Sequence, residues 1–282
     1  MRKKKHWAPS FLGRLLSNIP QNQKWLFPFY QAGQLSLTRE TFVSASLPSA
    51  WDGLTIAFCS DIHFGPMFSK QRAIMLFEKM NALNADLMLL GGDYGETTQL
   101  GIELFDCIPR PSARLGVFAS IGNHDLKGTD DQFSTLIQKM ENKGIMPLQN
   151  ASYTLSRQDA DLIVCATDDI KLGKPDLRML TAESRSPSYT IFFPHSPDIL
   201  PAILKNDRKA FDLALCGHTH GGQLTFCGHS LRSSSKYGDR YRSGWIKEQN
   251  HSIFVSNGVG TSLIPVRLGA PPQYHLITLR KA

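Results

Sequence analysis

Residues 213–223 of the chain read LALCGHTHGGQ. The apolar half of this stretch predicts a buried strand over residues 211–215, because a short continuous apolar run suits a strand covered on both faces. The polar residues after it then lie at the carboxyl end of the strand, where α/β sheets bind ligands. In an extended segment residues i and i+2 point the same way, so His218 and His220 are expected to face one site.

The same arrangement occurs four more times earlier in the chain. Side chains of metal-binding types follow apolar, strand-like runs, and in chain order they are Asp61 with His63, Asp93 after two glycines, Asn123-His124-Asp125 after Gly122, and His195 after Pro194. Because the carboxyl ends of strands in an α/β sheet border one crevice, these five groups are expected to converge.

The residue types of these groups indicate a metal centre. Asp, His and Asn are the hard-to-borderline ligands that suit Mn²⁺, Fe²⁺ or Zn²⁺. Glycines directly before Asp93, Asn123 and His218 allow the tight turns that bring the backbone close to an ion. Each motif alone is also found at an ordinary strand end, and His195 alone also fits a hydrogen-bonded core histidine. All five together, in this order, favour the metal centre.

The rest of the body alternates strands and helices and then becomes richer in strands. The expected strands cover residues 54–60, 86–90, 115–121, 145–148, 152–155, 162–166, 189–193, 211–215, 223–226, 252–255 and 274–279. The expected helices cover residues 70–83, 102–108, 131–143, 176–182 and 198–204. Since residues 41–282 contain no internal repeat and no linker, they are expected to form one two-sheet α/β domain.

The charge excess of +7 comes entirely from residues 1–39 of an N-terminal arm, residues 1–40. Residues 1–39 contain seven bases and no acid, which leaves bases and acids equal in the remainder. The composition, with 41% hydrophobic and 20% charged residues, excludes disordered, collagen-like and disulfide-scaffold proteins. Five cysteines without a C-x-x-C pair indicate a reducing compartment and no redox motif.

The arm combines bases with apolar and aromatic side chains, as helices at a membrane interface do. Phe11, Leu12, Leu15, Leu16 and Ile19 form one stripe, and residues 25–30 are strongly aromatic. Each base near an anionic leaflet contributes about 1 kcal/mol of attraction. Without an apolar run of ~18 residues or an export signal, we expect a cytoplasmic protein, peripheral on the inner face of the cell membrane. Packing of the stripe on the body and nucleic-acid binding remain alternatives for the arm.

Taken together, the motifs resemble those of the calcineurin-like metallophosphoesterase superfamily, which run D-x-H, G-D, G-N-H-[DE], H and G-H-x-H. The resemblance covers about residues 54–280 and implies a four-layer αββα sandwich of two mixed sheets with two adjacent metal ions. By position, the implied ligands of the first ion are Asp61, His63, Asp93 and His220. Those of the second ion are Asp93, Asn123, His195 and His218, so Asp93 would bridge the pair.

Such a pair of divalent ions would acidify a shared water and clamp a phosphoryl group between them. We expect Mn²⁺, with Fe²⁺ or Zn²⁺ as alternatives. The metal-bridging hydroxide then attacks phosphorus directly, and the sequence has no serine or cysteine nucleophile signature. His124 is expected to protonate or stabilise the departing oxygen, with Asp125 or Asp61 orienting it.

Several stretches are similar to the small bacterial single-domain branch of this superfamily, namely residues 89–94, 195–198, 213–223 and 239–244. That branch includes membrane-linked phosphodiesterases and a UDP-2,3-diacylglucosamine pyrophosphatase. The resemblance therefore implies a phosphodiesterase or pyrophosphatase acting on a phosphorylated lipid or nucleotide-lipid at an anionic membrane surface. We expect no nucleic-acid partner, because no basic surface can be traced in the body to continue the arm, and no obligate protein partner.

Two arginines are candidates for further phosphate contacts, because a guanidinium binds phosphate oxygens in pairs. They are Arg240 and Arg267, although each also fits an ordinary surface base. Asp168 and Asp169 fit either a strand-end turn or a position behind the metal site. Two other functions remain open: the same metal site acting on soluble nucleotides or nucleic acid ends, and a metal-free scaffold.

Overall fold

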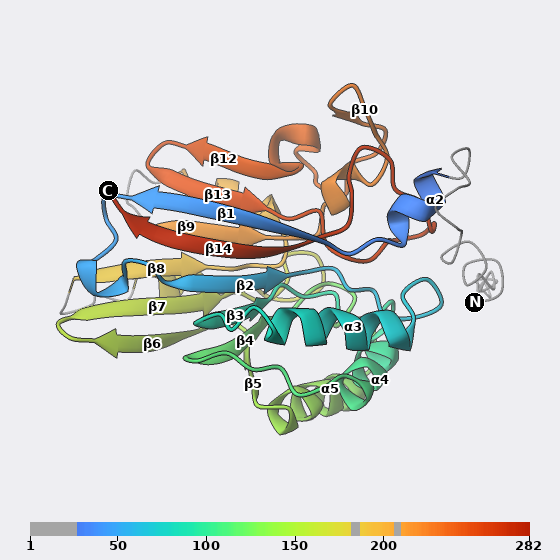
Figure 1. Cartoon of the computed structure of the whole chain (residues 1–282), viewed down its shortest axis with the longest axis horizontal. Helices are drawn as coiled ribbons and strands as arrows, with labels where there is room; N and C mark the ends of the chain where they lie inside the picture. Colours follow the sequence, from blue (N-terminus) through green and yellow to red (C-terminus); the bar gives the residue numbers. More distant parts are fainter. Residues whose placement is uncertain (1–26, 182–186, 206–209) are drawn as a thin grey trace.

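A computed structural model describes residues 27–181, 187–205 and 210–282 (Figure 1). Two six-stranded sheets form its centre, with strand orders β1-β14-β2-β3-β4-β5 and β12-β13-β9-β8-β7-β6. The first sheet contains β1 (Ser36–Ser44), β14 (Gln273–Lys281), β2 (Thr55–Cys59), β3 (Leu87–Leu90), β4 (Gly116–Ser120) and β5 (Ile145–Leu148). The second contains β12 (Gly244–Glu248), β13 (His251–Val255), β9 (Leu213–Cys216), β8 (Ser188–Phe192), β7 (Ala160–Ala166) and β6 (Ala151–Arg157).

Both sheets are mixed, as expected. In the first sheet β2 to β5 are parallel, and β14 pairs antiparallel with β2 but parallel with β1. In the second sheet β7, β8, β9 and β13 are parallel, while the edge strands β6 and β12 run antiparallel to their neighbours. The carboxyl ends of the parallel strands therefore lie together at one end of the molecule.

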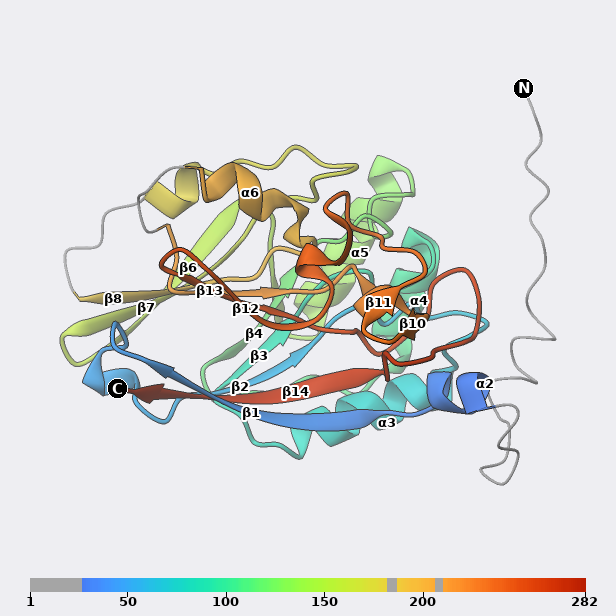
Figure 2. The same cartoon turned by 90° about the horizontal axis from the view of Figure 1, so that it is seen from above.

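Helices cover the outer faces of the two sheets, which gives the expected αββα order of layers. The described helices are α2 (Phe27–Ala32), α3 (Lys70–Asn81), α4 (Thr98–Cys107), α5 (Asp130–Asn142) and α6 (Leu200–Ile203). Figure 2 shows α3 and α6 on opposite sides of the sheets. None of the helices in the described ranges is both long and apolar enough to span a membrane.

Alternating side chains of the strands build the layers. Ile56 and Phe58 of β2 are buried in the core between the sheets, whereas Ala57 and Cys59 pack with α3, α4 and α5. In the second sheet, Ala214 and Cys216 of β9 face α6 in the same way. Because successive strand residues point to opposite faces, a wholly apolar strand is the natural sequence for a sheet covered on both sides.

The helix boundaries follow their capping residues. The Thr97 side chain accepts a hydrogen bond from the Leu100 backbone N–H, so α4 begins at Thr98 and not near residue 102 as expected. Thr129 and Gln132 form a reciprocal capping box at the start of α5. The helix expected over residues 176–182 is only a short 3₁₀ turn, Arg178–Thr181, within the described residues.

The strands at the ends of the described chain differ most from expectation. The sequence did not predict β1, and the expected boundary between arm and body at residue 40 falls inside it. β12 was also not predicted, and the strand expected over 223–226 is reduced to β10 (Thr225–Phe226), paired with β11 (His229–Ser230). The arm's basic and leucine-rich part, residues 1–26, lies outside the described residues.

Candidate metal centre

The structure brings the predicted metal ligands together at the carboxyl ends of five parallel strands. They follow the strands in this order: Asp61 and His63 after β2, Asp93 after β3, Asn123 after β4, His195 after β8, and His218 and His220 after β9. Residues that are separated by up to 159 positions in the sequence thus share one buried site.

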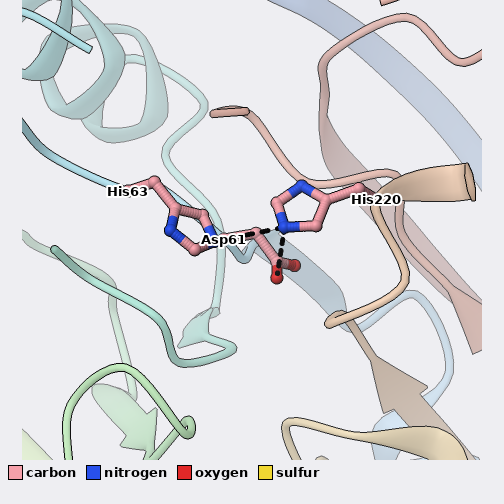
Figure 3. A group of neighbouring side chains, drawn as sticks. All are labelled: Asp61, His63 and His220. Atoms are coloured by element: carbon pink, nitrogen blue, oxygen red, sulfur yellow. Dashed lines mark hydrogen bonds and ion pairs between the residues drawn. The ribbon is translucent and has the colours of Figure 1, made fainter. Parts of the chain in front are cut away.

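The first group of ligands is Asp61, His63 and His220 (Figure 3). The Nε2 atoms of His63 and His220 are 3.1 Å apart, and His220 Nε2 lies 3.6 Å from Asp61 Oδ1. All three side chains are buried. Two imidazole nitrogens and a carboxylate oxygen therefore point at one small volume.

The second group adjoins the first and contains Asp93, His195 and His218. His195 Nε2 lies 3.1 Å from His218 Nδ1 and 3.3 Å from Asp93 Oδ2. The same Asp93 oxygen lies 3.5 Å from His63 Nε2 in the first group. One carboxylate oxygen thus faces both groups, which is the position a bridging ligand needs.

The nitrogen and oxygen atoms of the two groups are arranged as ligands of two divalent cations and do not form a complete set of hydrogen bonds among themselves. Within the described residues, the buried Asn123 Oδ1 has no hydrogen-bond partner, and such orphaned buried atoms are rare in native proteins. In each group two imidazole nitrogens lie 3.1 Å apart, which is a hydrogen-bond distance. The two nitrogens of each group therefore point at the same small volume. The set of nitrogen and oxygen ligands suits a first-row divalent ion.

The electrostatics of the centre also favour added positive charge. Burial alone would raise the pKa of Asp93, but the surrounding histidines, His195 first, hold that pKa well below its usual range. Burial would lower the pKa of His195, but Asp93 and Asp61 outweigh it and raise the pKa to about 10. Divalent cations would displace such a proton, which couples metal binding to proton release.

Five of the seven ligands have backbone angles in the left-handed region, which side chains other than glycine rarely adopt. Their φ angles are 54° for Asp61, 47° for His63, 56° for Asp93, 69° for His218 and 53° for His220. Backbone strain of this kind is typical of sites whose surroundings enforce one geometry. The loops are therefore held in place by their neighbours, among them Asp61, whose carboxylate accepts a hydrogen bond from the His218 N–H.

Asp125, which the sequence places beside His124 as a group that would orient it, positions backbone groups of the centre in the structure. Its buried carboxylate accepts hydrogen bonds from the backbone N–H groups of Asp93, Tyr94 and Gly122, at 2.8 to 2.9 Å. Burial, and to a lesser degree the nearby Asp93, raise the pKa of Asp125 to about 7. Because its oxygens are taken by these bonds, Asp125 fixes the two loops that carry Asp93 and Asn123.

His124 lines the pocket above the predicted metal ligands, and Glu96 and Lys127 contact its ring. Its backbone N–H donates to Asp93 Oδ1 at 2.7 Å, and its ring nitrogen Nδ1 lies 2.9 Å from the Glu96 carbonyl oxygen. The Lys127 ammonium lies 2.8 Å from His124 Nε2. In the described residues the ring is thus contacted by Glu96 and Lys127, and its orientation by Asp125 or Asp61 stays a prediction.

The two arginines expected to bind substrate lie elsewhere. Arg267 is fully buried and donates to backbone carbonyl oxygens, including those of Gly260, His220 and Ala270. Arg240 is paired with Glu248, 2.7 Å away, and does not line the pocket above the metal ligands. Arg267 therefore stabilises the loop that carries His220. Arg240 forms a surface ion pair with Glu248 on β12.

Lys171 is a pocket residue that the sequence did not reveal. Its ammonium lies 2.5 Å from His218 Nε2 and 3.1 Å from the Ser234 carbonyl oxygen. The Asp169 carboxylate accepts from the Lys171 backbone N–H, and Asp168 accepts from the Asp169 N–H. Asp168 and Asp169 thus form a strand-end turn that positions the backbone of Lys171. The Asp168-Asp169 pair was the only feature of the sequence that pointed to this part of the pocket.

A pocket of about 490 Å³ lies over the metal ligands. Its lining includes the polar side chains of Lys171, Arg232 and His124 and the apolar side chains of Leu231, Leu263 and Ile264. Cations beside a metal centre suit an anionic substrate, because they add charge-assisted hydrogen bonds to phosphate oxygens. The apolar side chains could contact an apolar part of the same substrate.

Two adjoining groups of buried His and Asp ligands, at the strand ends of an αββα sandwich, define a metal-dependent phosphoesterase, a hydrolase. The chain belongs to the calcineurin-like phosphoesterase family, whose sequence model matches residues 54–222. This range begins just before β2 and ends just after His220, so it includes every predicted metal ligand.

Three bacterial relatives are similar to the chain over most of its length. The uncharacterized metallophosphoesterase YkuE of Bacillus subtilis is 28% identical over 258 residues, covering 89% of this chain and 88% of the relative. The uncharacterized protein YpbG of the same organism is 30% identical over 80% of this chain and 81% of its own length. The phosphodiesterase YaeI of Escherichia coli is 28% identical over 79% of this chain and 81% of its own length.

Proposed function

We propose that the protein hydrolyses a phosphodiester or diphosphate bond in a lipid-linked substrate, such as UDP-2,3-diacylglucosamine, at the inner face of the cell membrane. The observation that carries this proposal is the mixed lining of the pocket, which includes the basic Lys171 and Arg232 and the apolar Leu263 and Ile264. A substrate with both phosphate and acyl groups can contact both kinds of side chain, whereas a free nucleotide leaves the apolar ones in water. The basic part of the arm, residues 1–26, would supply attraction to an anionic membrane.

Two divalent cations, which we propose to be Mn²⁺, would neutralise the phosphoryl group and activate the attacking water when bound. Asp61, His63 and His220 would hold one of them, and Asn123, His195 and His218 the other, with Asp93 between them. The remaining steps fall to other side chains of the pocket. His124 faces the substrate and stabilises the departing oxygen, while Lys171 and Arg232 bind the phosphate oxygens that the reaction leaves unchanged.

The direct test compares three substrates with Mn²⁺: UDP-2,3-diacylglucosamine in detergent micelles, the deacylated UDP-sugar, and bis(p-nitrophenyl) phosphate. We expect hydrolysis of the soluble diester and a higher kcat/KM for the acylated UDP-sugar than for its deacylated form. Equal kcat/KM values for the last two would reject the lipid-linked substrate and favour soluble nucleotides. Hydrolysis of none of the three would reject the proposed reaction.

Replacing His124 with glutamine is expected to lower kcat by about 100-fold for a substrate with a basic leaving group, the lower end of the range for general acid catalysis. Glutamine cannot donate a titratable proton to the departing oxygen. The effect should be much smaller for bis(p-nitrophenyl) phosphate, since p-nitrophenolate leaves without protonation. His229→Gln is the matched control, because the His229 side chain is 85% exposed. Equal losses on both substrates would contradict the acid role.

Replacing Lys171 with methionine is expected to raise KM for a diphosphate substrate by about tenfold, the equivalent of one charge-assisted hydrogen bond. Methionine is also unbranched and ends at the position of the lysine Cε, so the substitution removes the ammonium group and keeps most of the apolar stem. KM for bis(p-nitrophenyl) phosphate, which has a single phosphate, should change less. Lys174→Met, at an exposed position three residues on, serves as control. A diphosphate KM equal to that of the parent would exclude Lys171 from substrate binding.

A further inference from the structure

Leu231, Leu263 and Ile264 are exposed apolar side chains that line the pocket. Leu172 directly follows the pocket residue Lys171, and Phe226 lies two residues after the pocket residue Leu224; both are exposed as well. We call these five side chains the apolar rim. Within the described residues, the three most exposed large apolar side chains all belong to it, with exposed fractions of 76% for Leu231, 72% for Leu263 and 69% for Phe226. Scattered exposed apolar residues are ordinary, but a cluster rimmed by polar residues marks an interaction site.

The loops of the rim are bound to each other and hold their side chains outward. The Gln223 side chain donates to the carbonyl oxygens of Ser262 and Ile264 and accepts from the Ser262 N–H. Leu263 has a φ of 67°, in the left-handed region, which is costly for a leucine. Because Leu263 is exposed, packing inside the protein does not offset this cost.

The N-terminal arm joins the body beside the rim. The Arg267 backbone N–H, four residues after Leu263, donates to the Pro28 carbonyl oxygen in α2 at 2.9 Å. Figures 1 and 2 both show α2 at the end of the molecule where β10, the strand of Phe226, lies. The chain before α2 contains six bases and no acid, Arg2, Lys3, Lys4, Lys5, Arg14 and Lys24.

Positive charge also lies within the pocket itself. Arg232 directly follows Leu231, and Lys171 directly precedes Leu172, so each of these two rim leucines has a cation beside it in the sequence. Both cations line the pocket. Apolar side chains next to cations are the composition of surfaces that enter the interface of an anionic bilayer.

We propose that the apolar rim docks on an anionic lipid bilayer, its side chains entering the interface so that the pocket opens onto the lipid headgroups. This docking proposal rests on the proposed function, because only an enzyme with a lipid-linked substrate needs to reach that substrate in the membrane. It assigns contact with the membrane to the folded body, in addition to the arm. Docking itself needs neither metal nor catalysis, so the two proposals can fail separately.

The test is flotation of the full chain with vesicles of phosphatidylglycerol and phosphatidylethanolamine. The rim variant carries Leu172→Ser and Phe226→Ser, two exposed positions that do not line the pocket. The matched control carries Val43→Ser and Met146→Ser, which are exposed on β1 and β5. We expect the rim variant to lose about tenfold or more of the parent's partition coefficient, and the control variant to keep it.

Two outcomes would overturn the docking surface. Equal flotation of parent and rim variant would mean that the rim does not contact lipid. A parent that is dimeric by light scattering, with a monomeric rim variant and unchanged flotation, would assign the rim to contact between two copies of the chain. The rim variant should keep the parent's rate on soluble bis(p-nitrophenyl) phosphate, which shows that the metal site is intact.

A second measurement places the rim in the membrane directly. Cys227, next to Phe226, is exposed, whereas Cys59, Cys165 and Cys216 are buried. With Cys107, which is half-buried, replaced by serine, an environment-sensitive fluorophore attaches at Cys227 alone. We expect its emission to shift to the blue when anionic vesicles are added, and an unchanged emission would contradict docking. If docking holds but no acylated substrate is cleaved, only the proposed function fails.

Discussion

Replacing Asp93 with asparagine is expected to lower metal-dependent hydrolysis of bis(p-nitrophenyl) phosphate by about 10³-fold or more. The Asp93 Oδ2 atom lies 3.5 Å from His63 Nε2 and 3.3 Å from His195 Nε2, between the two groups of ligands. Asparagine keeps the shape of the side chain but removes the negative charge that two cations would share. Charge stabilisation by metal ions supplies several kcal/mol of catalysis, and each 1.36 kcal/mol corresponds to tenfold in rate.

The Asp93→Asn variant should also bind less metal, since a buried ligand has lost its charge. The parent, purified without chelators, is expected to contain up to two divalent ions per chain and the variant fewer. Asp106→Asn is the matched control, because Asp106 forms only a surface ion pair with Lys139. It should keep the parent's metal content and activity. An Asp93→Asn variant as active as the parent, with an unchanged unfolding temperature, would reject the two-metal site.

The ligands of this centre were predictable because they are local features of the sequence. Each follows an apolar run that is a strand in the structure, and the parallel order of those strands brings their ends together without further information. The bridging position of Asp93 came from family resemblance and stays a prediction; in the structure Asp93 Oδ2 lies 3.5 Å from His63 Nε2 and 3.3 Å from His195 Nε2. The strand-helix alternation of the first half was predictable for the same reason.

β1 was not predictable, because its hydrogen-bonding partner lies at the other end of the chain. Ser36 pairs with Gln273 in a parallel register, a contact that no local pattern encodes. β1 is also an edge strand with half-exposed side chains, so its sequence lacks the continuous apolar run that marked β2 and β3. The contact between Lys171 and His218 could not be predicted from the sequence for the same reason, because it joins two loops 47 residues apart.

Arg267 shows why a charged residue is difficult to place from sequence. Arginines are mostly exposed, and buried ones usually have an acidic partner. The partners of Arg267 in the hydrogen bonds of the described residues are mainly backbone carbonyl oxygens, which every residue has, so the sequence contains no sign of its burial. Burial lowers the pKa of Arg267 to about 9, yet the guanidinium stays charged at neutral pH.

Replacing Arg267 with methionine is therefore expected to lower the free energy of unfolding by about 4 kcal/mol, since each buried acceptor left unpaired costs about 1–3 kcal/mol. Three carbonyl oxygens, of His220, Gly260 and Ala270, would lose their donor. Methionine is chosen because its flexible side chain fills most of the volume. Arg267→Lys should be intermediate, because it keeps the charge but has no planar fork of donors.

Urea unfolding of the metal-free chain measures this loss, and Arg280→Met is the matched control. Arg280 is 54% exposed and pairs with Asp52, so its replacement should cost no more than about 0.5 kcal/mol, as for most surface positions. Because Arg267 holds the carbonyl of His220, its loss should also weaken metal retention, whereas Arg280→Met should not. An Arg267→Met variant as stable as the parent would mean that water replaces the guanidinium among these carbonyl groups. The loop of His220 would then be held by Asp61 and by its own turn, and not by Arg267.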